Sequence, residues 1–234
     1  FSDIWLHEGF ATYSEILFAE STLGYENSLL YARYYIAASI KNRFPVVGPA
    51  GVSYWNSGDN DVYNKGAMIL HTIRNIVNDS TLFFDILQTF YLENAAGSHV
   101  TTEDFIRVVE RKTGKDWHDF FEVYLCRREV PVLHWYYSPA GIEGAPALPT
   151  GNGGPVIAAK WTGVPEGFSM PVEFFCKEQN VTITIEVSTE AELFYDEALT
   201  ECARLICNRR LSYFEPVTVK SLLHEAASSG RGTE

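Results

Sequence analysis

The sequence contains no run of basic residues, no apolar stretch of membrane-spanning length and no pair of cysteines at Cys-x-x-Cys spacing. Its 18 Lys and Arg residues are outnumbered by 30 Asp and Glu residues, which gives a net charge of -12. An acidic surface repels phosphate backbones and anionic lipid, so we expect no nucleic-acid partner and no membrane partner. A membrane-spanning helix would also need roughly 18 consecutive apolar residues.

Four cysteines are present: Cys126, Cys176, Cys202 and Cys207. They are too few for a disulfide scaffold in a chain of this length, and their spacing differs from that of a zinc ribbon. We therefore expect buried thiols. The alternative is a single disulfide in an exported parent protein.

Hydrophobic residues make up 46% of the sequence and aromatic residues 14%, which is enough for an extensive core. Between Asp3 and about Leu125, apolar side chains recur at three- and four-residue spacing, which predicts helices. Thr101 provides a helix-start signal, and Gly114 provides a stop signal. The predicted helices cover residues 3–20, 25–43, 62–78, 80–93, 101–113 and 116–125.

The pattern changes after Pro131. Short runs of β-branched and aromatic residues predict strands, and residues 181–187 alternate apolar and polar side chains as in a half-buried antiparallel strand. Residues 138–155 are rich in Gly and Pro, which indicates a linker or a long hairpin loop. The sequence thus predicts a multi-domain α+β protein: a helical bundle at 1–130, a small antiparallel β-sandwich at 131–220 and a flexible tail at 221–234.

Residues 44–61 form a long irregular segment that contains Tyr54 and Trp55. Long loops in compact domains often line a cleft, so these two aromatic side chains are candidates for a substrate pocket. An ordinary aromatic cluster would explain them equally well.

Glu8 lies in an otherwise apolar and aromatic helical segment. A fully buried Glu is rare unless it is paired or binds a metal, because removing water from an ionised carboxylate costs several kcal/mol or more. The segment therefore predicts a buried Glu8 that binds a cation.

Two motifs resemble a known family. Residues 5–13, Trp-Leu-His-Glu-Gly-Phe-Ala-Thr-Tyr, are similar to the segment Trp-Leu-Asn-Glu-Gly-Phe-Ala-Thr-Tyr of the zinc aminopeptidases (gluzincins of the aminopeptidase N and leukotriene hydrolase type). About 55 residues further on, Tyr63-Asn-Lys-Gly66 resembles the family's Tyr-x-Lys-Gly signature. The resemblance implies that residues 1–130 are the carboxy-terminal half of a thermolysin-like catalytic domain.

The resemblance also implies a zinc site of two histidines and a glutamate. Glu8 matches the glutamate ligand, whereas the histidines come from a His-Glu-x-x-His helix in which both imidazoles share one face. That pattern is absent from residues 1–234. We therefore expect zinc in the intact parent but not in this chain alone, and we expect the chain alone to be inactive and to need the missing amino-terminal part as its partner.

Tyr63 matches the family's tyrosine whose hydroxyl stabilises the tetrahedral intermediate, and the alternative is a packed aromatic residue at a helix start. Gly66 is expected to permit close helix packing. Glu15 lies two turns after Glu8 on the same face, where it would support the site or be a solvated or locally paired carboxylate. His7 points about 100° away from Glu8, so a structural role is favoured over a second ligand.

The sequence thus predicts part of a zinc metallo-aminopeptidase with Glu8 as the metal ligand and Tyr63 as the catalytic residue, acting on peptides. One alternative is a non-catalytic scaffold of the same fold. Another is a relative with a different hydrolytic activity, such as the family's epoxide hydrolase branch.

Overall fold

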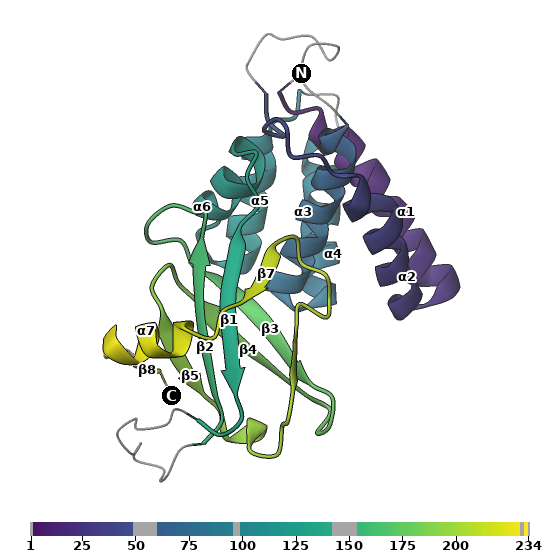
Figure 1. Cartoon of the computed structure of the whole chain (residues 1–234). Helices are drawn as coiled ribbons and strands as arrows, with labels where there is room; N and C mark the ends of the chain where they lie inside the picture. Colours follow the sequence, from purple (N-terminus) through teal and green to yellow (C-terminus); the bar gives the residue numbers. More distant parts are fainter. Residues whose placement is uncertain (1, 49–59, 96–98, 142–153, 230–231, 234) are drawn as a thin grey trace. The chain divides into compact units, whose positions relative to one another are not determined.

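The computed structural model describes residues 2–48, 60–95, 99–141, 154–229 and 232–233 (Figure 1). The chain divides into a helical unit, residues 1–130 with 211–213, and a β unit, residues 131–210 with 214–234. The α+β class predicted from the sequence is confirmed, with a helical region followed by a small sandwich of two sheets.

One helix of the first unit begins and ends at the signals seen in the sequence. Thr101 and Asp104 form a reciprocal capping box at the start of this helix, and Gly114 ends it in a left-handed conformation with φ 67°. The elements are α1 (Trp5–Leu23), α2 (Tyr25–Tyr31), π-helix η1 (Ala32–Ile36), 3-10 helix η2 (Ala37–Ser39), α3 (Asp61–Val77), α4 (Ser80–Asn94), α5 (Thr102–Thr113), α6 (His118–Phe121) and π-helix η4 (Glu122–Cys126). The helix predicted over 25–43 is thus shorter and changes to π geometry at Ala32.

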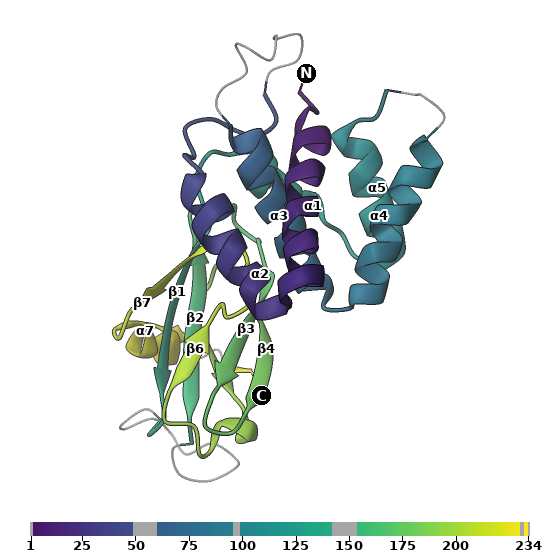
Figure 2. The ribbon, with the colours of Figure 1, turned by 90° about the vertical axis from the view of Figure 1, so that its right-hand side faces the viewer.

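Aromatic side chains fill the core between these helices. Helix α1 lies beside α3 on one side and faces α4 and α5 on the other (Figure 2). Its Phe10 reaches Phe90 of α4 and Phe105 of α5, with ring centroids 5.8 and 5.4 Å apart. Trp5 also meets Phe105, at 6.0 Å. Helix α1 is therefore held from two sides, which fixes the position of the residues that it presents.

The β unit contains two sheets. One has the strand order β7-β1-β2-β5-β8, with parallel pairs at both edges, and the other is the antiparallel sheet β4-β3-β6. Strands β1 and β2 are antiparallel neighbours. Most of the predicted linker or long hairpin loop between them, residues 142–153, lies outside the described residues. The strands are β1 (Val132–Ser138), β2 (Val156–Thr162), β3 (Met170–Cys176), β4 (Val181–Val187), β5 (Glu192–Tyr195), β6 (Leu205–Cys207), β7 (Glu215–Thr218) and β8 (Gly232–Thr233).

The predicted flexible tail is wrong for residues 222–229, which form helix α7 (Leu222–Ser229). Leu222, Leu223 and Ala226 are buried against Val156 and Ala158 of β2. The prediction was based on the polar composition of the tail and overlooked these three apolar residues, whose spacing places them on one face of a helix. Because successive strand residues face opposite sides, β2 is covered by α7 on one face, and its other face is buried as well.

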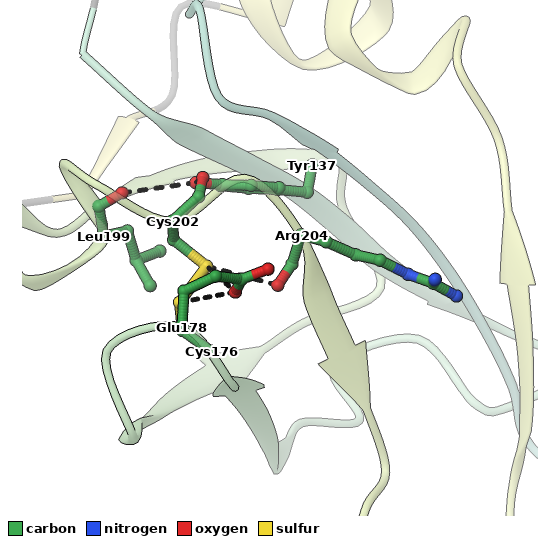
Figure 3. Close-up of a disulfide and its surroundings, with 6 residues drawn as sticks. All are labelled: Tyr137, Cys176, Glu178, Leu199, Cys202 and Arg204. Atoms are coloured by element: carbon green, nitrogen blue, oxygen red, sulfur yellow. Dashed lines mark hydrogen bonds between the residues drawn. A yellow bond between two sulfur atoms is a disulfide. The ribbon is translucent and has the colours of Figure 1, made fainter.

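The prediction of four thiols is also wrong. Cys176 and Cys202 form a disulfide with their Cα atoms 5.9 Å apart, whereas Cys126 and Cys207 are free. The disulfide lies at the carboxyl end of β3 and beside the main-chain oxygen of Arg204 (Figure 3). Sequence spacing alone could not identify this pair, because the 26 residues between its members are brought together only by the sheet.

Replacing both Cys176 and Cys202 with alanine is expected to lower the free energy of unfolding of the β unit by about 3.5 kcal/mol, the loop-closure value for this separation. Urea unfolding with and without a dithiol reductant measures the change. The control is Cys126→Ser at the exposed free thiol of the helical unit. A wild-type midpoint that does not respond to the reductant would contradict the prediction.

Within the described residues, no helix combines the length and the apolar character needed to cross a membrane.

Candidate functional site

The two sequence motifs meet at a pair of glycines. A Cβ atom built on Gly66 would lie 3.0 Å from the Cα of Gly9, and one built on Gly9 would lie 3.0 Å from the Cα and C atoms of Gly66. Helices α1 and α3 therefore touch backbone to backbone, as the sequence analysis expects of Gly66. A methyl group at either position would require the facing backbone to shift by a few tenths of an ångström.

Contacts between residues that follow Gly9 and Gly66 in sequence show that α1 and α3 run in the same direction. The ring centroids of Tyr13 and His71 lie 6.1 Å apart. Closer to the carboxyl ends of the helices, Arg74 forms a bidentate ion pair with Glu20, with N–O distances of 2.6 and 2.9 Å. Residue numbers thus increase in the same direction along both helices, starting from the contact of Gly9 with Gly66. Along the axes, Glu8 lies about 1.5 Å and Tyr63 about 4.5 Å before the glycine contact.

Glu8 is half-buried in the structure, so the expectation of full burial is wrong. Its neighbours Trp5, Leu6 and Gly9 are buried, but the carboxylate-bearing side of the helix is partly open. The apolar composition of the segment reflects the opposite faces of α1, which pack against the other helices. An accessible carboxylate remains available as a ligand for a cation.

Tyr63 lies in the first turn of α3 and is half-buried. The start of this helix is fixed by Asp61, which is buried and accepts hydrogen bonds from the backbone N–H groups of Lys41 and Asn42, at 2.9 and 2.6 Å. Asp61 thereby ties the segment after η2 to the turn that carries Tyr63.

Tyr63 lines a groove of about 520 Å³ together with Thr12 and Glu15. Thr12 and Glu15 follow Glu8 by four and seven residues, so all three lie on one face of α1. The face that carries Glu8 and the side chain of Tyr63 are therefore on the same side of the α1–α3 pair.

Glu15 is exposed at this groove, and its Oε2 atom accepts a hydrogen bond of 2.7 Å from the Tyr31 hydroxyl. It is therefore a locally paired carboxylate, which was one of the two alternatives from the sequence. His7 is exposed and makes no side-chain hydrogen bond with the described residues. Tyr54 and Trp55 lie outside the described residues.

Residues 1–124, just over half of the chain, match the Peptidase family M1 domain. The chain belongs to peptidase family M1. No curated protein matches the chain. Membership confirms the peptidase relationship suggested by residues 5–13 and 63–66.

Members of family M1 are in general zinc-dependent, so the described residues can be tested for a complete zinc site. Glu8 is not part of any cluster of three His, Cys, Asp or Glu donors among them. One carboxylate is a suitable ligand but does not make a site, since zinc sites normally have at least three protein ligands. Around Glu8, the described residues thus offer a single carboxylate and no complete zinc site.

One donor cluster does occur in the described parts of the chain, formed by Cys176, Glu178 and Cys202. Glu178 Oε2 lies 3.4 Å from one sulfur and 3.9 Å from the other (Figure 3). Both sulfurs are joined in the disulfide and are not thiolates, which are the form that binds zinc. This cluster is therefore not a zinc site of the M1 type.

Sequence reasoning missed three residues that shape the groove: Asp61, Tyr31 and Tyr35. The signal for the two tyrosines was their four-residue spacing at the end of a helix, which places them on one face. Asp61 gave the weaker signal of an acidic residue in the first turn of a helix.

Replacing Gly66 with alanine is expected to lower the stability of the helical unit by about 1–3 kcal/mol, because the added methyl meets backbone rather than a movable side chain. Thermal unfolding followed by circular dichroism measures the change. The control is Ser14→Ala on the exposed side of α1, which should change stability by at most about 0.5 kcal/mol. An equal or higher melting temperature for Gly66→Ala would show that the helices do not need this contact.

Proposed function

We propose that this chain supplies one zinc ligand and one oxyanion-stabilising hydroxyl to a zinc aminopeptidase, which removes amino-terminal residues from peptides. The observation that supports the proposal is the contact between Gly9 and Gly66, which joins the two M1 motifs. Through it, the Glu8 face of α1 and Tyr63 of α3 border the same side of one helix pair. A packing motif alone would have no need of an accessible carboxylate at that place.

Glu8 contributes a carboxylate oxygen, a ligand type that zinc accepts. The chemistry that zinc supplies in such sites is polarisation of the scissile carbonyl and activation of water. Helix α1 holds Glu8 in position because it is packed from two sides, through Gly9 against α3 and through Phe10 against α4 and α5.

Tyr63 contributes an O–H donor. When water adds to the peptide carbonyl, negative charge collects on the carbonyl oxygen, and a fixed donor stabilises that charge more than the uncharged substrate. The hydrogen bonds to Asp61 fix the turn that carries Tyr63, so the backbone that presents its side chain is in place before substrate binds.

The two histidine ligands and the general base would come from a His-Glu-x-x-His helix outside residues 1–234, and the chain alone would be inactive. The test compares residues 1–234 with the polypeptide extended upstream to include that helix. The extended form is expected to hold about one zinc per chain and to hydrolyse aminoacyl reporter compounds but not their N-acetylated forms. Residues 1–234 alone are expected to do neither.

Two outcomes would favour other functions. An extended polypeptide that retains zinc and hydrolyses an epoxide but no aminoacyl reporter would assign the chain to the epoxide hydrolase branch. A parent sequence without His-Glu-x-x-His, and without hydrolytic activity, would indicate a scaffold.

A further inference from the structure

The groove beside Tyr63 is built from polar and aromatic side chains. It runs along the Glu15 face of α1, the π-helix η1 and the start of α3. No Lys or Arg is present among the described residues that line it, and its one charged group is a carboxylate. The lining residues are Thr12, Glu15, Tyr31, Tyr35, Ile36, Asn60, Tyr63 and Asn64.

One oxygen of the Glu15 carboxylate accepts a hydrogen bond, which orients the group, and the other oxygen does not. The Oε2 atom accepts the hydrogen bond from Tyr31, whereas Oε1 makes no hydrogen bond with the described residues. This hydrogen bond raises the pKa of the Tyr31 hydroxyl, and burial adds to the effect, so Tyr31 remains a protonated donor at neutral pH. Glu15 thus lines the groove with a carboxylate that is held by one hydrogen bond and whose second oxygen accepts none from the described residues.

Tyr31 and Tyr35 form an aromatic surface next to this carboxylate. Their rings are stacked, with centroids 5.2 Å apart and planes at 24°. Tyr35 belongs to π-helix η1, a rare geometry that occurs frequently at functional sites. The face of a tyrosine ring carries negative potential and attracts a cation within about 6 Å.

We propose that this groove is a subsite for a basic side chain, Lys or Arg, of the peptide substrate, with Glu15 binding its charge and Tyr31 and Tyr35 packing along its stem. The assignment rests on the proposed function, since Tyr63 in the same groove brings the side chain close to the reacting peptide bond. Charge complementarity selects this occupant. With no Lys or Arg among the described lining residues, the Glu15 carboxylate repels acidic side chains, and an apolar side chain would leave its oxygen without a partner.

Binding can be measured without hydrolysis. Argininamide and leucinamide are titrated into residues 1–234 and followed by NMR chemical shifts. Argininamide is expected to bind about tenfold more tightly, the size of one charge-assisted hydrogen bond, and to lose that advantage in Glu15→Gln and in high salt. Equal affinities for the two amides in the wild-type chain would overturn the subsite.

Tyr34 offers a matched control for the aromatic surface. Tyr34 and Tyr35 are adjacent and similarly exposed, at 65% and 68%, but only Tyr35 lines the groove. Tyr35→Ala is expected to weaken argininamide binding severalfold, and Tyr34→Ala should leave it unchanged. Equal losses in both variants would show that the tyrosines act through general folding and would remove Tyr35 from the subsite.

Kinetics of the extended polypeptide separate this inference from the proposed function. Glu15→Gln is expected to raise KM about tenfold for arginyl and lysyl reporters with little change in kcat, and to leave leucyl reporters unaffected, because it removes binding energy that acts equally before and during reaction. An active enzyme whose arginyl-to-leucyl preference survives Glu15→Gln refutes the subsite alone. An inactive wild-type enzyme refutes the proposed function, and the amide titration still decides the subsite.

Discussion

Replacing Tyr63 with phenylalanine in the extended, zinc-containing polypeptide is expected to lower kcat by on the order of 100-fold or more, with KM nearly unchanged. The substitution removes one hydroxyl and keeps the ring that packs in the first turn of α3. The lost hydrogen bond is one that strengthens as the carbonyl oxygen becomes charged, so the effect belongs to the chemical step. Steady-state hydrolysis of an aminoacyl reporter measures both constants.

Tyr63→Phe should retain its zinc and its melting temperature, which distinguishes a lost donor from a damaged fold. Tyr34→Phe provides the matched control, because Tyr34 is exposed and lies outside the groove. An unchanged kcat in a folded, zinc-loaded Tyr63→Phe variant would remove Tyr63 from the mechanism.

Replacing Glu8 with alanine is expected to abolish zinc retention by the extended polypeptide and, with it, hydrolysis. A three-ligand site that loses its carboxylate keeps only two histidines, which bind zinc too weakly to survive dialysis against a chelator. Metal content after dialysis measures the effect directly. Because Glu8 is only half-buried, its loss should change the melting temperature of the zinc-free protein little.

The matched control for the metal measurement is Glu103→Ala, which removes an exposed carboxylate from the first turn of α5. Full zinc occupancy in Glu8→Ala would refute the ligand assignment. Loss of zinc in Glu103→Ala as well would indicate that any loss of acidic charge weakens metal binding.

The sequence predicted the parts of the fold that depend on local patterns. The capping pair of Thr101 and Asp104, the stop at Gly114 and the alternation in β4 each result from interactions a few residues apart. Close packing at Gly66 was also predictable, because a glycine inside a helical pattern usually has a packing reason. Its partner Gly9 was not, because only the tertiary contact identifies it.

Predictions that depended on long-range contacts were wrong or incomplete. The partner of Cys176 depends on how β3 approaches the segment around Cys202, and the order of residues 222–229 depends on the surface that β2 offers to α7. The burial of Glu8 was overestimated because the apolar composition of the segment describes the whole helix and does not show which face is exposed. Tyr31 and Tyr35 became candidates only when Glu15 and Tyr63 appeared in the same groove.

The residues proposed for the reaction lie next to the glycine contact between α1 and α3, and the residues proposed for substrate selectivity lie away from it. The residues proposed for the reaction, Glu8 and Tyr63, are each within three positions of that contact, whereas Tyr31 and Tyr35 belong to the connecting stretch between the two helices. If the proposed function and the proposed subsite hold, substitutions of Tyr31 and Tyr35 are expected to change which peptides are accepted while the spacing of Glu8 and Tyr63 is preserved. Libraries aimed at new selectivity should vary Tyr31 and Tyr35 and leave both glycines and the segment 41–42 that binds Asp61 untouched.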